Sequence, residues 1–322
     1  MADPRAEVGG RFAEWLAVRG VAGEVEVEGR TTVGLSQETW LLRVETDAGS
    51  VAAVLRLPTR ASGPRAILTQ RAALQAVANR GIPAPRLLWF DDGEQNPFGL
   101  PFIVMERAPG AVPVGWHVVP AEARTALAEQ AIDVLATLHA IDVGCTPLGS
   151  SAGSPLLEPA GLHRLLERLA PLPAAVRTAL WWLERHAPPP TSRRVLVHGD
   201  YRMGNFAVDG DRISGVLDWE MAGPGDPIVD VAWCCIPVWE LPGVDEEPLL
   251  RRYAERSGQP ADAERFHWHR VLGYVRLAYY ALAGTRAFDA ARSDDFRLAA
   301  LRLQLPVTLD RLAATLAGEP VT

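Results

Sequence analysis

Polar side chains capable of chemistry follow two short apolar runs of the sequence. Residues 195–197 lead into His198-Gly-Asp-Tyr-Arg-Met-Gly-Asn205, and residues 213–217 lead into Asp218-Trp-Glu. A carboxylate can accept a proton from a reacting hydroxyl, and carboxylate and amide oxygens are ligands that Mg²⁺ accepts beside water and phosphate. Each residue alone would more often be structural, but their joint spacing at two strand ends favours a catalytic centre.

The two apolar runs are expected to pair as a hairpin that brings this chemistry together. A turn at 209–212 with a regular register would pair Asn205 with Val216. Strand alternation would then place Asn205 and Asp218 on the same face, as two candidate Mg²⁺ ligands. Asp200, at the mouth of the same loop, is the candidate base.

Beyond this spacing, the sequence resembles a known superfamily, the protein-kinase-like small-molecule kinases, which include aminoglycoside and macrolide phosphotransferases and choline kinases. The segment from His198 to Asn205 resembles their catalytic loop, and Asp218-Trp-Glu resembles their metal-binding segment. Residues 217–232 are most similar to the subgroup also found fused to acyl-CoA dehydrogenases. The resemblance implies that Asp200 is the catalytic base and that Asn205 and Asp218 hold Mg²⁺ on the nucleotide phosphates.

The same resemblance implies supporting roles for four further residues. Arg202 matches the position at which protein kinases carry a charge-neutralising lysine. His198 is expected to pack the loop without acting as an acid or base. Asp226 and Asp230 flank the start of an apolar helix, and in the family such residues brace the catalytic loop by hydrogen bonds. Capping of that helix is the alternative reading for both.

The nucleotide side is expected in the first hundred residues. Residues 32–42 resemble the hairpin that covers the phosphates in this family, with Gly34 and Ser36 offering backbone and hydroxyl donors. A later strand is expected to end in the hinge, whose backbone from Glu106 to Ala108 would hydrogen-bond the purine.

Arg56 falls where kinases usually place the lysine that pairs with the α- and β-phosphates. Arginine can grip phosphate bidentately, so the task remains chemically reasonable. Ile67, Gln70, Leu74 and Val77 share one helix stripe by their spacing, which puts Gln70 in the place of the usual glutamate partner. A neutral amide can accept a hydrogen bond from Arg56 but cannot neutralise its charge.

The composition excludes several other functions. All 32 basic residues of the 322 are arginine, so a Schiff-base lysine and the lysine of the common phosphate-binding loop are ruled out. The net charge of −7, with scattered arginines, gives no basic surface for nucleic acid. Cys145, Cys234 and Cys235 are predicted to be buried reduced thiols. Neither a signal sequence nor a membrane-spanning run is found, and a cytoplasmic protein is expected.

The elements that must position these residues predict an α+β, protein-kinase-like, two-lobed fold. Residues 1–108 would form a nucleotide-binding N-lobe with a small antiparallel sheet, and residues 109–322 a mostly helical C-lobe with the catalytic loop and acceptor helices. Strands are predicted over 25–28, 38–45, 50–57, 86–90, 101–106, 195–197 and 213–217. Helices are predicted over 5–19, 64–80, 120–140, 156–170 and 173–186, and within 246–317.

The sequence therefore predicts an Mg²⁺-dependent O-phosphotransferase that moves the γ-phosphate of ATP or GTP to a hydroxyl of a metabolite or antibiotic. The alternative is a pseudokinase that holds nucleotide in a regulatory or scaffolding role, which Arg56 and Gln70 suggest. The sequence pattern does not specify which acceptor is used or what the oligomeric state is. Aromatic residues at 233–285 could surround a cationic acceptor, although aromatic side chains at helical spacing are more often core.

Overall fold

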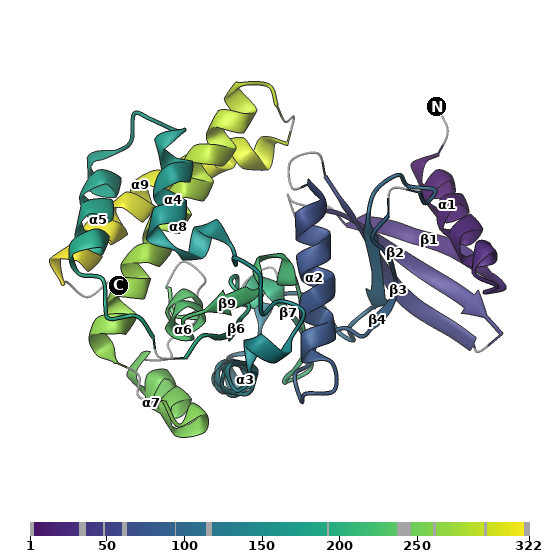
Figure 1. Ribbon diagram of the computed structural model, residues 1–322, viewed down its shortest axis with the longest axis horizontal. Coiled ribbons are helices and arrows are strands. Elements are labelled where there is room, and N and C mark those ends of the chain that lie inside the picture. Colours follow the sequence, from purple (N-terminus) through teal and green to yellow (C-terminus); the bar gives the residue numbers. More distant parts are fainter. Residues whose placement is uncertain are drawn as a thin grey trace. The chain divides into compact units, whose positions relative to one another are not determined.

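The chain folds into two compact units in the computed structural model (Figure 1). The first comprises Met1–Val112, Thr146–Leu148 and Asn205–Ala222, and the second comprises Pro113–Cys145, Gly149–Gly204 and Gly223–Thr322. The chain thus passes between units within the segment that carries the candidate chemistry. The structure describes residues 3–31, 37–47, 49–59, 63–93, 95–113, 118–191, 193–236, 246–259, 262–292 and 295–318.

The first unit is built on a five-stranded antiparallel sheet with the order β1-β2-β3-β5-β4. Helix α1 begins where Asp3 accepts a hydrogen bond from the amide of Arg5. Its Phe12 and Trp15 are buried against Phe102 of the sheet, with ring centroids 6.1 and 5.1 Å away. The elements are α1 (Pro4–Val18), β1 (Gly23–Thr31), β2 (Gln37–Thr46), β3 (Gly49–Pro58), α2 (Gly63–Val77), β4 (Leu87–Asp91) and β5 (Phe102–Glu106).

Strand β3 places Arg56 on the opposite side of the sheet from this core. Leu55 is fully buried in the cluster with Phe12 and Trp15, and successive strand residues point to opposite faces. Helix α2 follows β3 in the chain and contacts it, so Arg56 meets α2. The register is fixed by pairing with β5, in which Arg56 lies opposite Ile103.

The hairpin β7 (Phe206–Asp209) and β8 (Arg212–Val216) also belongs to the first unit. The expected pairing of Asn205 with Val216 is wrong. A bulge between Ala207 and Val208 makes Phe206 the partner of Val216 and leaves Asn205 outside the strand. The parity argument for Asn205 and Asp218 therefore fails, because one extra residue reverses the faces of a strand.

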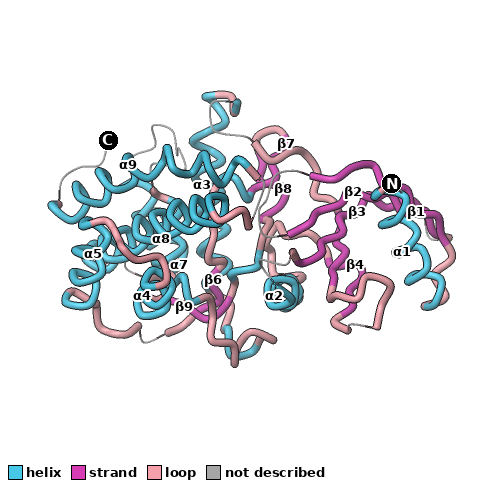
Figure 2. Tube along the Cα trace, turned by 90° about the horizontal axis from the view of Figure 1, so that it is seen from above, coloured by secondary structure: helices cyan, strands magenta, loops and turns pink. Residues whose placement is uncertain are grey.

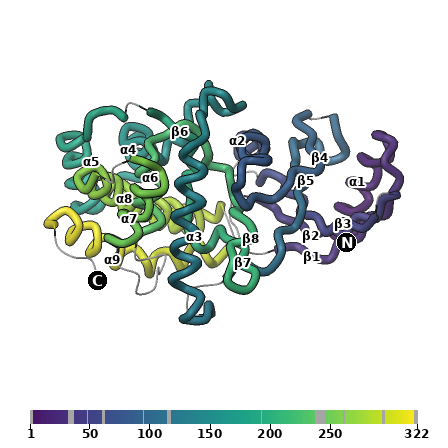
Figure 3. Tube along the Cα trace, turned by 90° about the horizontal axis from the view of Figure 1, so that it is seen from below, coloured from purple at the N-terminus to yellow at the C-terminus, as the bar shows by residue number. Residues whose placement is uncertain are grey.

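The second unit is mostly helical (Figures 2 and 3). Helix α8 packs against both α6 and α9, and α3 packs against α7. Trp233, Trp268 and Leu272 lie in its buried core. Its main elements are α3 (Ala121–His139), α4 (Pro159–Glu167), α5 (Ala174–Arg185), β6 (Val195–Val197), β9 (Gly223–Gly225), α6 (Ile228–Cys234), α7 (Glu246–Ser257), α8 (Ala263–Asp289) and α9 (Phe296–Ala317).

Three local expectations need correction. The helix predicted from 156 begins at Pro159, because Pro155–Leu157 form a separate 3-10 turn. Strand β9 was not predicted, since Gly-Pro-Gly carries no strand signal, yet it pairs antiparallel with β6. Cys145 is exposed, whereas Cys234 and Cys235 are buried as predicted. Among the described residues, no helix has both the length and the apolar character needed to cross a membrane.

Candidate active site

The loop that follows β6 is anchored by a buried carboxylate. Asp230, in the first turn of α6, accepts hydrogen bonds from the backbone amides of His198 at 2.7 Å and Gly199 at 2.8 Å. His198 is fully buried, and Gly199 has a φ of 84°, which glycine adopts without strain. This turn sets the direction in which the next residue, Asp200, leaves the strand.

His139 of α3 supports Asp230, and Tyr253 of α7 in turn holds His139. His139 Nε2 lies 3.3 Å from its carboxylate, and His139 Nδ1 lies 2.8 Å from the hydroxyl of Tyr253. Burial opposes ionisation of Asp230, but hydrogen bonding to His139, electrostatic attraction to His139, and the hydrogen bond from the His198 amide keep its pKa below the usual value. A charged acceptor for the two loop amides is therefore maintained at neutral pH.

Asp200 is held from two sides within the second unit. Trp233 Nε1 donates to its Oδ1 at 2.8 Å, and Arg202 Nε lies 3.2 Å from both carboxylate oxygens. The amide of Asp200 also donates to His198 Nδ1 at 3.2 Å. About a sixth of the Asp200 side chain, 16%, is exposed. An ionised carboxylate with this degree of exposure can accept a proton from a bound hydroxyl.

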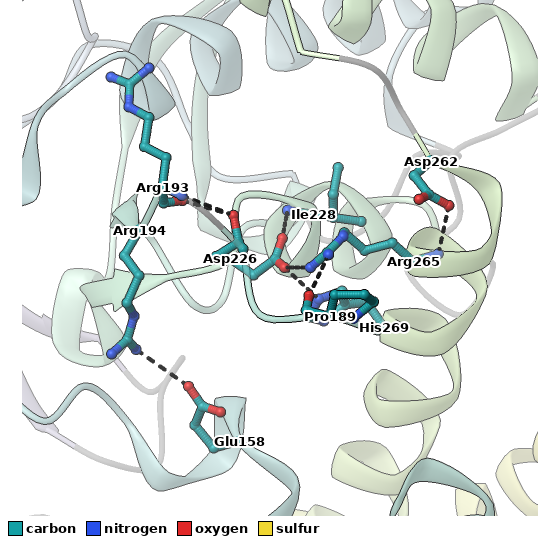
Figure 4. A network of polar contacts seen from close by, with 10 residues as sticks. Glu158, Pro189, Arg193, Arg194, Asp226, Ile228, Asp262, Arg265 and His269 are labelled. Atoms are coloured by element: carbon teal, nitrogen blue, oxygen red, sulfur yellow. Dashed lines mark hydrogen bonds and ion pairs between the residues drawn. The ribbon is translucent and has the colours of Figure 1, made fainter. Parts of the chain in front are cut away.

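Asp226 lies in a network of polar contacts at the start of α6 (Figure 4). It accepts a hydrogen bond from the amide of Ile228 at 3.0 Å, and it forms an ion pair with Arg265 on α8. His269 Nε2 lies 3.5 Å from the same carboxylate. Burial opposes its ionisation, but these neighbours lower the pKa of Asp226 to about 2. Its bonds therefore join the start of α6 to α8.

Arg56, Gln70 and Asp218 form a connected group within the first unit. Arg56 Nη1 donates to Gln70 Oε1 at 2.8 Å and to Asp218 Oδ1 at 2.9 Å. Gln70 is fully buried, and the Arg56 side chain is only 11% exposed. The carboxylate beside Arg56 is thus supplied by Asp218, which follows β8, whereas helix α2 supplies an amide.

Two members of this group were not predicted from the sequence. Gln37, at the start of β2, donates from Nε2 to Glu220 Oε2 at 2.7 Å and lies 3.4 Å from Gln70 Oε1. Glu220 stands two residues after Asp218, and that proximity was the only signal in the sequence. Gln37 and Glu220 are 183 positions apart, so local sequence patterns could not predict their contact.

Asp218 and Asn205, the predicted Mg²⁺ ligands, lie at one end of the β7–β8 hairpin. The amide of Leu217 donates to the carbonyl of Asn205 at 2.8 Å, which joins the two segments. Asp218 has φ 66° and ψ 57°, a left-handed conformation uncommon for residues other than glycine, asparagine and aspartate. A carboxylate and an amide suit Mg²⁺, which keeps water and phosphate as its other ligands. In the described ranges, no three His, Cys, Asp or Glu side chains form a cluster that could hold a metal.

The expected purine hinge follows β5. The amide of Glu106 donates to the carbonyl of Arg86 at 2.9 Å, and the amide of Arg107 donates to the carbonyl of Ala52 at 2.9 Å. The amides of Glu106 and Arg107 are therefore already bonded to carbonyls of neighbouring segments of the sheet. Ala108 is the next residue along the chain beyond these bonds. Gly34 and Ser36, the predicted phosphate-covering residues, lie outside the described residues.

The aromatic residues considered for an acceptor are largely core. Trp233, Trp268 and Tyr274 are 1%, 7% and 0% exposed. Tyr279 and Tyr280 are partly buried and pack against the same core. Side chains this enclosed do not form an open aromatic cage. Trp239 lies outside the described residues.

Gln70→Glu tests the neutral partner of Arg56. Glutamate Oε1 can still accept from Arg56 and Gln37, and a buried ion pair is close to neutral in net stability. We expect the free energy of unfolding to change by less than about 1 kcal/mol, measured by urea denaturation. A loss above about 3 kcal/mol, the scale for an uncompensated buried charge, would contradict the contact between positions 70 and 56.

Comparison with known proteins places these features in context. The profile of the phosphotransferase enzyme family (APH) matches residues 31–274. Mouse acyl-CoA dehydrogenase family member 10 is 30% identical over 210 residues, covering 61% of this chain and 19% of that protein. The chain thus spans about a fifth of that relative's length.

Solved structures show the same fold over nearly the whole chain. A candidate aminoglycoside phosphotransferase of Ralstonia eutropha JMP134 has a TM-score of 0.79 at 20% identity, covering 97% of this chain and 99% of that one. A thermostable mutant of aminoglycoside phosphotransferase APH(4)-Ia, in complex with ADP and hygromycin B, has a TM-score of 0.65 at 20% identity, covering 98% and 100%. The kinase-like α+β fold is therefore confirmed.

Proposed function

Because this chain belongs to the phosphotransferase enzyme family, we propose that it is an Mg²⁺-dependent small-molecule kinase that uses ATP or GTP and a hydroxylated acceptor. The observation that carries the proposal is Asp200, a partly exposed carboxylate oriented by Trp233 and Arg202 on a loop anchored by Asp230. The similar structure that holds ADP and hygromycin B supports a nucleotide and a small hydroxylated molecule as the substrates.

The first unit is the proposed nucleotide-binding part. Arg56, backed by Gln70, offers a guanidinium to the α- and β-phosphates, and arginine suits such bidentate contacts. The backbone near Glu106 and Ala108 is proposed for the purine. Asn205 and Asp218 are the proposed ligands of Mg²⁺, which would offset the negative charge on the phosphate oxygens when bound.

The second unit supplies the proposed base. During transfer, a bond forms between the acceptor oxygen and the γ-phosphorus as the bond from that phosphorus to the bridging β-oxygen breaks. The hydroxyl proton passes to the carboxylate of Asp200, and the nucleoside diphosphate leaves. Arg202, beside Asp200, provides positive charge next to the γ-phosphoryl group.

Purified protein with ATP or GTP, Mg²⁺ and a panel of acceptors tests this function. The panel would contain aminoglycosides, macrolides, choline, and hydroxy acids with their CoA esters, and nucleoside diphosphate release would be measured. Acceptor-dependent release that stops when EDTA removes Mg²⁺ is the expected result. Nucleotide binding that ignores Mg²⁺, with no release on any acceptor, would favour the pseudokinase suggested by the Arg56–Gln70 pair.

Arg56→Ala should act mainly on nucleotide affinity. Hydrogen bonds to charged groups contribute about 1.5–3 kcal/mol, so we expect the nucleotide KM to rise about 10- to 100-fold. The acceptor KM should change far less. Arg43→Ala is the matched control, because Arg43 is also a paired arginine of the sheet, bonded to Glu28 at 2.7 Å. An unchanged nucleotide KM in Arg56→Ala would remove Arg56 from the site.

A further inference from the structure

We propose that Trp233 and Arg276 are positioning residues for Asp200, a role that rests on the proposed kinase function. Trp233 lies in α6 and donates its indole N–H to Asp200 Oδ1 at 2.8 Å. An indole N–H can only donate, so this bond has one possible direction. Together with Arg202 Nε, which lies 3.2 Å from both carboxylate oxygens, this bond restrains the rotation of the carboxyl group.

Arg276 contacts both the indole ring of Trp233 and the loop that carries Asp200. Its guanidinium carbon lies 3.8 Å from the centroid of the Trp233 ring, and its Nη2 donates to the carbonyl of Gly199 at 2.7 Å. Gly199 directly precedes Asp200. One buried side chain, 1% exposed, therefore sets the plane of the ring that bonds the carboxylate and the position of the backbone that carries it.

Helix α8 provides the room for this arrangement. Gly273 lies one turn before Arg276, and a Cβ at Gly273 would come within 2.5 Å of Ile236 and 3.4 Å of the Trp233 ring. Glycine thus lets α6 and α8 approach closely enough for the stacking. Because Trp233 is only 1% exposed, it orients Asp200 and does not contact an acceptor itself.

Trp233→Phe removes the donor and keeps an aromatic ring for Arg276. We expect kcat to fall about tenfold, because small displacements of a reacting group cost one to two orders of magnitude. The nucleotide KM should stay within about twofold, since ground-state binding is untouched. The matched control is Trp268→Phe, which removes another indole bond of the same core, to the carbonyl of Leu183 at 3.0 Å. An unchanged kcat in Trp233→Phe, or equal losses in both variants, would overturn the proposal.

A measurement without turnover separates this inference from the proposed function. The indole N–H resonance of Trp233, assigned by its loss in Trp233→Phe, should shift in Asp200→Asn, and that of Trp268 should not. An unmoved Trp233 resonance would overturn the positioning role even in an active kinase. Absence of turnover with every acceptor would instead count against the kinase function. The shift of the Trp233 resonance would then still test the hydrogen bond between Trp233 and Asp200.

Discussion

Asp200→Asn is expected to lower kcat by about 10²- to 10⁴-fold, the range for loss of a general base. The amide has the same shape as the carboxylate, and its oxygen can still accept from Trp233 and Arg202. The loop should therefore keep its conformation while losing the group that takes the proton. Steady-state turnover with the best acceptor, together with the nucleotide KM, measures the effect.

Asp133→Asn is the matched control for this variant. Asp133 is also an aspartate of the second unit, bonded to Arg252 at 2.7 Å, and it lies on α3. We expect it to lower thermal stability slightly and to leave kcat within about twofold of wild type. If Asp200→Asn kept more than about a tenth of the wild-type kcat, Asp200 would not be the base, because that loss is smaller than general-base catalysis supplies.

The fold was predictable where local patterns carry it. Alternating apolar residues gave the strands β2 and β3, and helical spacing placed Gln70 on the buried stripe of α2, where it does accept from Arg56 at 2.8 Å. The contiguous segments around Asp200 and Asp218 could be recognised because their residues are neighbours in the chain. Each of these segments lies directly after a strand and spans only a few residues of sequence.

What escaped prediction depends on packing between distant segments. The indole of Trp233 reaches Asp200 across 33 positions, and its aromatic character alone suggested only core. The bulge before Val208 depends on how the hairpin packs in the fold. It reversed the strand face that had been expected for Asn205. The ion pair of Arg56 with Asp218 joins residues 162 positions apart, which no periodicity reports.

Asp218→Asn is expected to weaken the dependence on Mg²⁺ most strongly. Asparagine tolerates the left-handed backbone at this position, so the turn should survive the change. Loss of even an outer partner of a metal site costs about 10- to 100-fold in affinity, and loss of a charged ligand should cost at least as much. The Mg²⁺ concentration for half-maximal turnover, at saturating nucleotide, measures it. Asp209→Asn, at the exposed end of β7 in the same hairpin, is the control.

The Arg56–Asp218 ion pair extends this prediction to the coupling between nucleotide binding and Mg²⁺ binding. Arg56 Nη1 donates to Asp218 Oδ1 at 2.9 Å, so Mg²⁺ would have to compete with a guanidinium for Asp218. Under the proposed function, a bound nucleotide would offer phosphate to Arg56 and so release Asp218 for the metal. Nucleotide and Mg²⁺ should therefore bind with positive coupling in wild type, and linkage requires the effect to be mutual. Calorimetric titration of nucleotide with and without Mg²⁺ should show this coupling in wild type and its loss in Asp218→Asn. Equal coupling in both proteins would place the metal on other ligands.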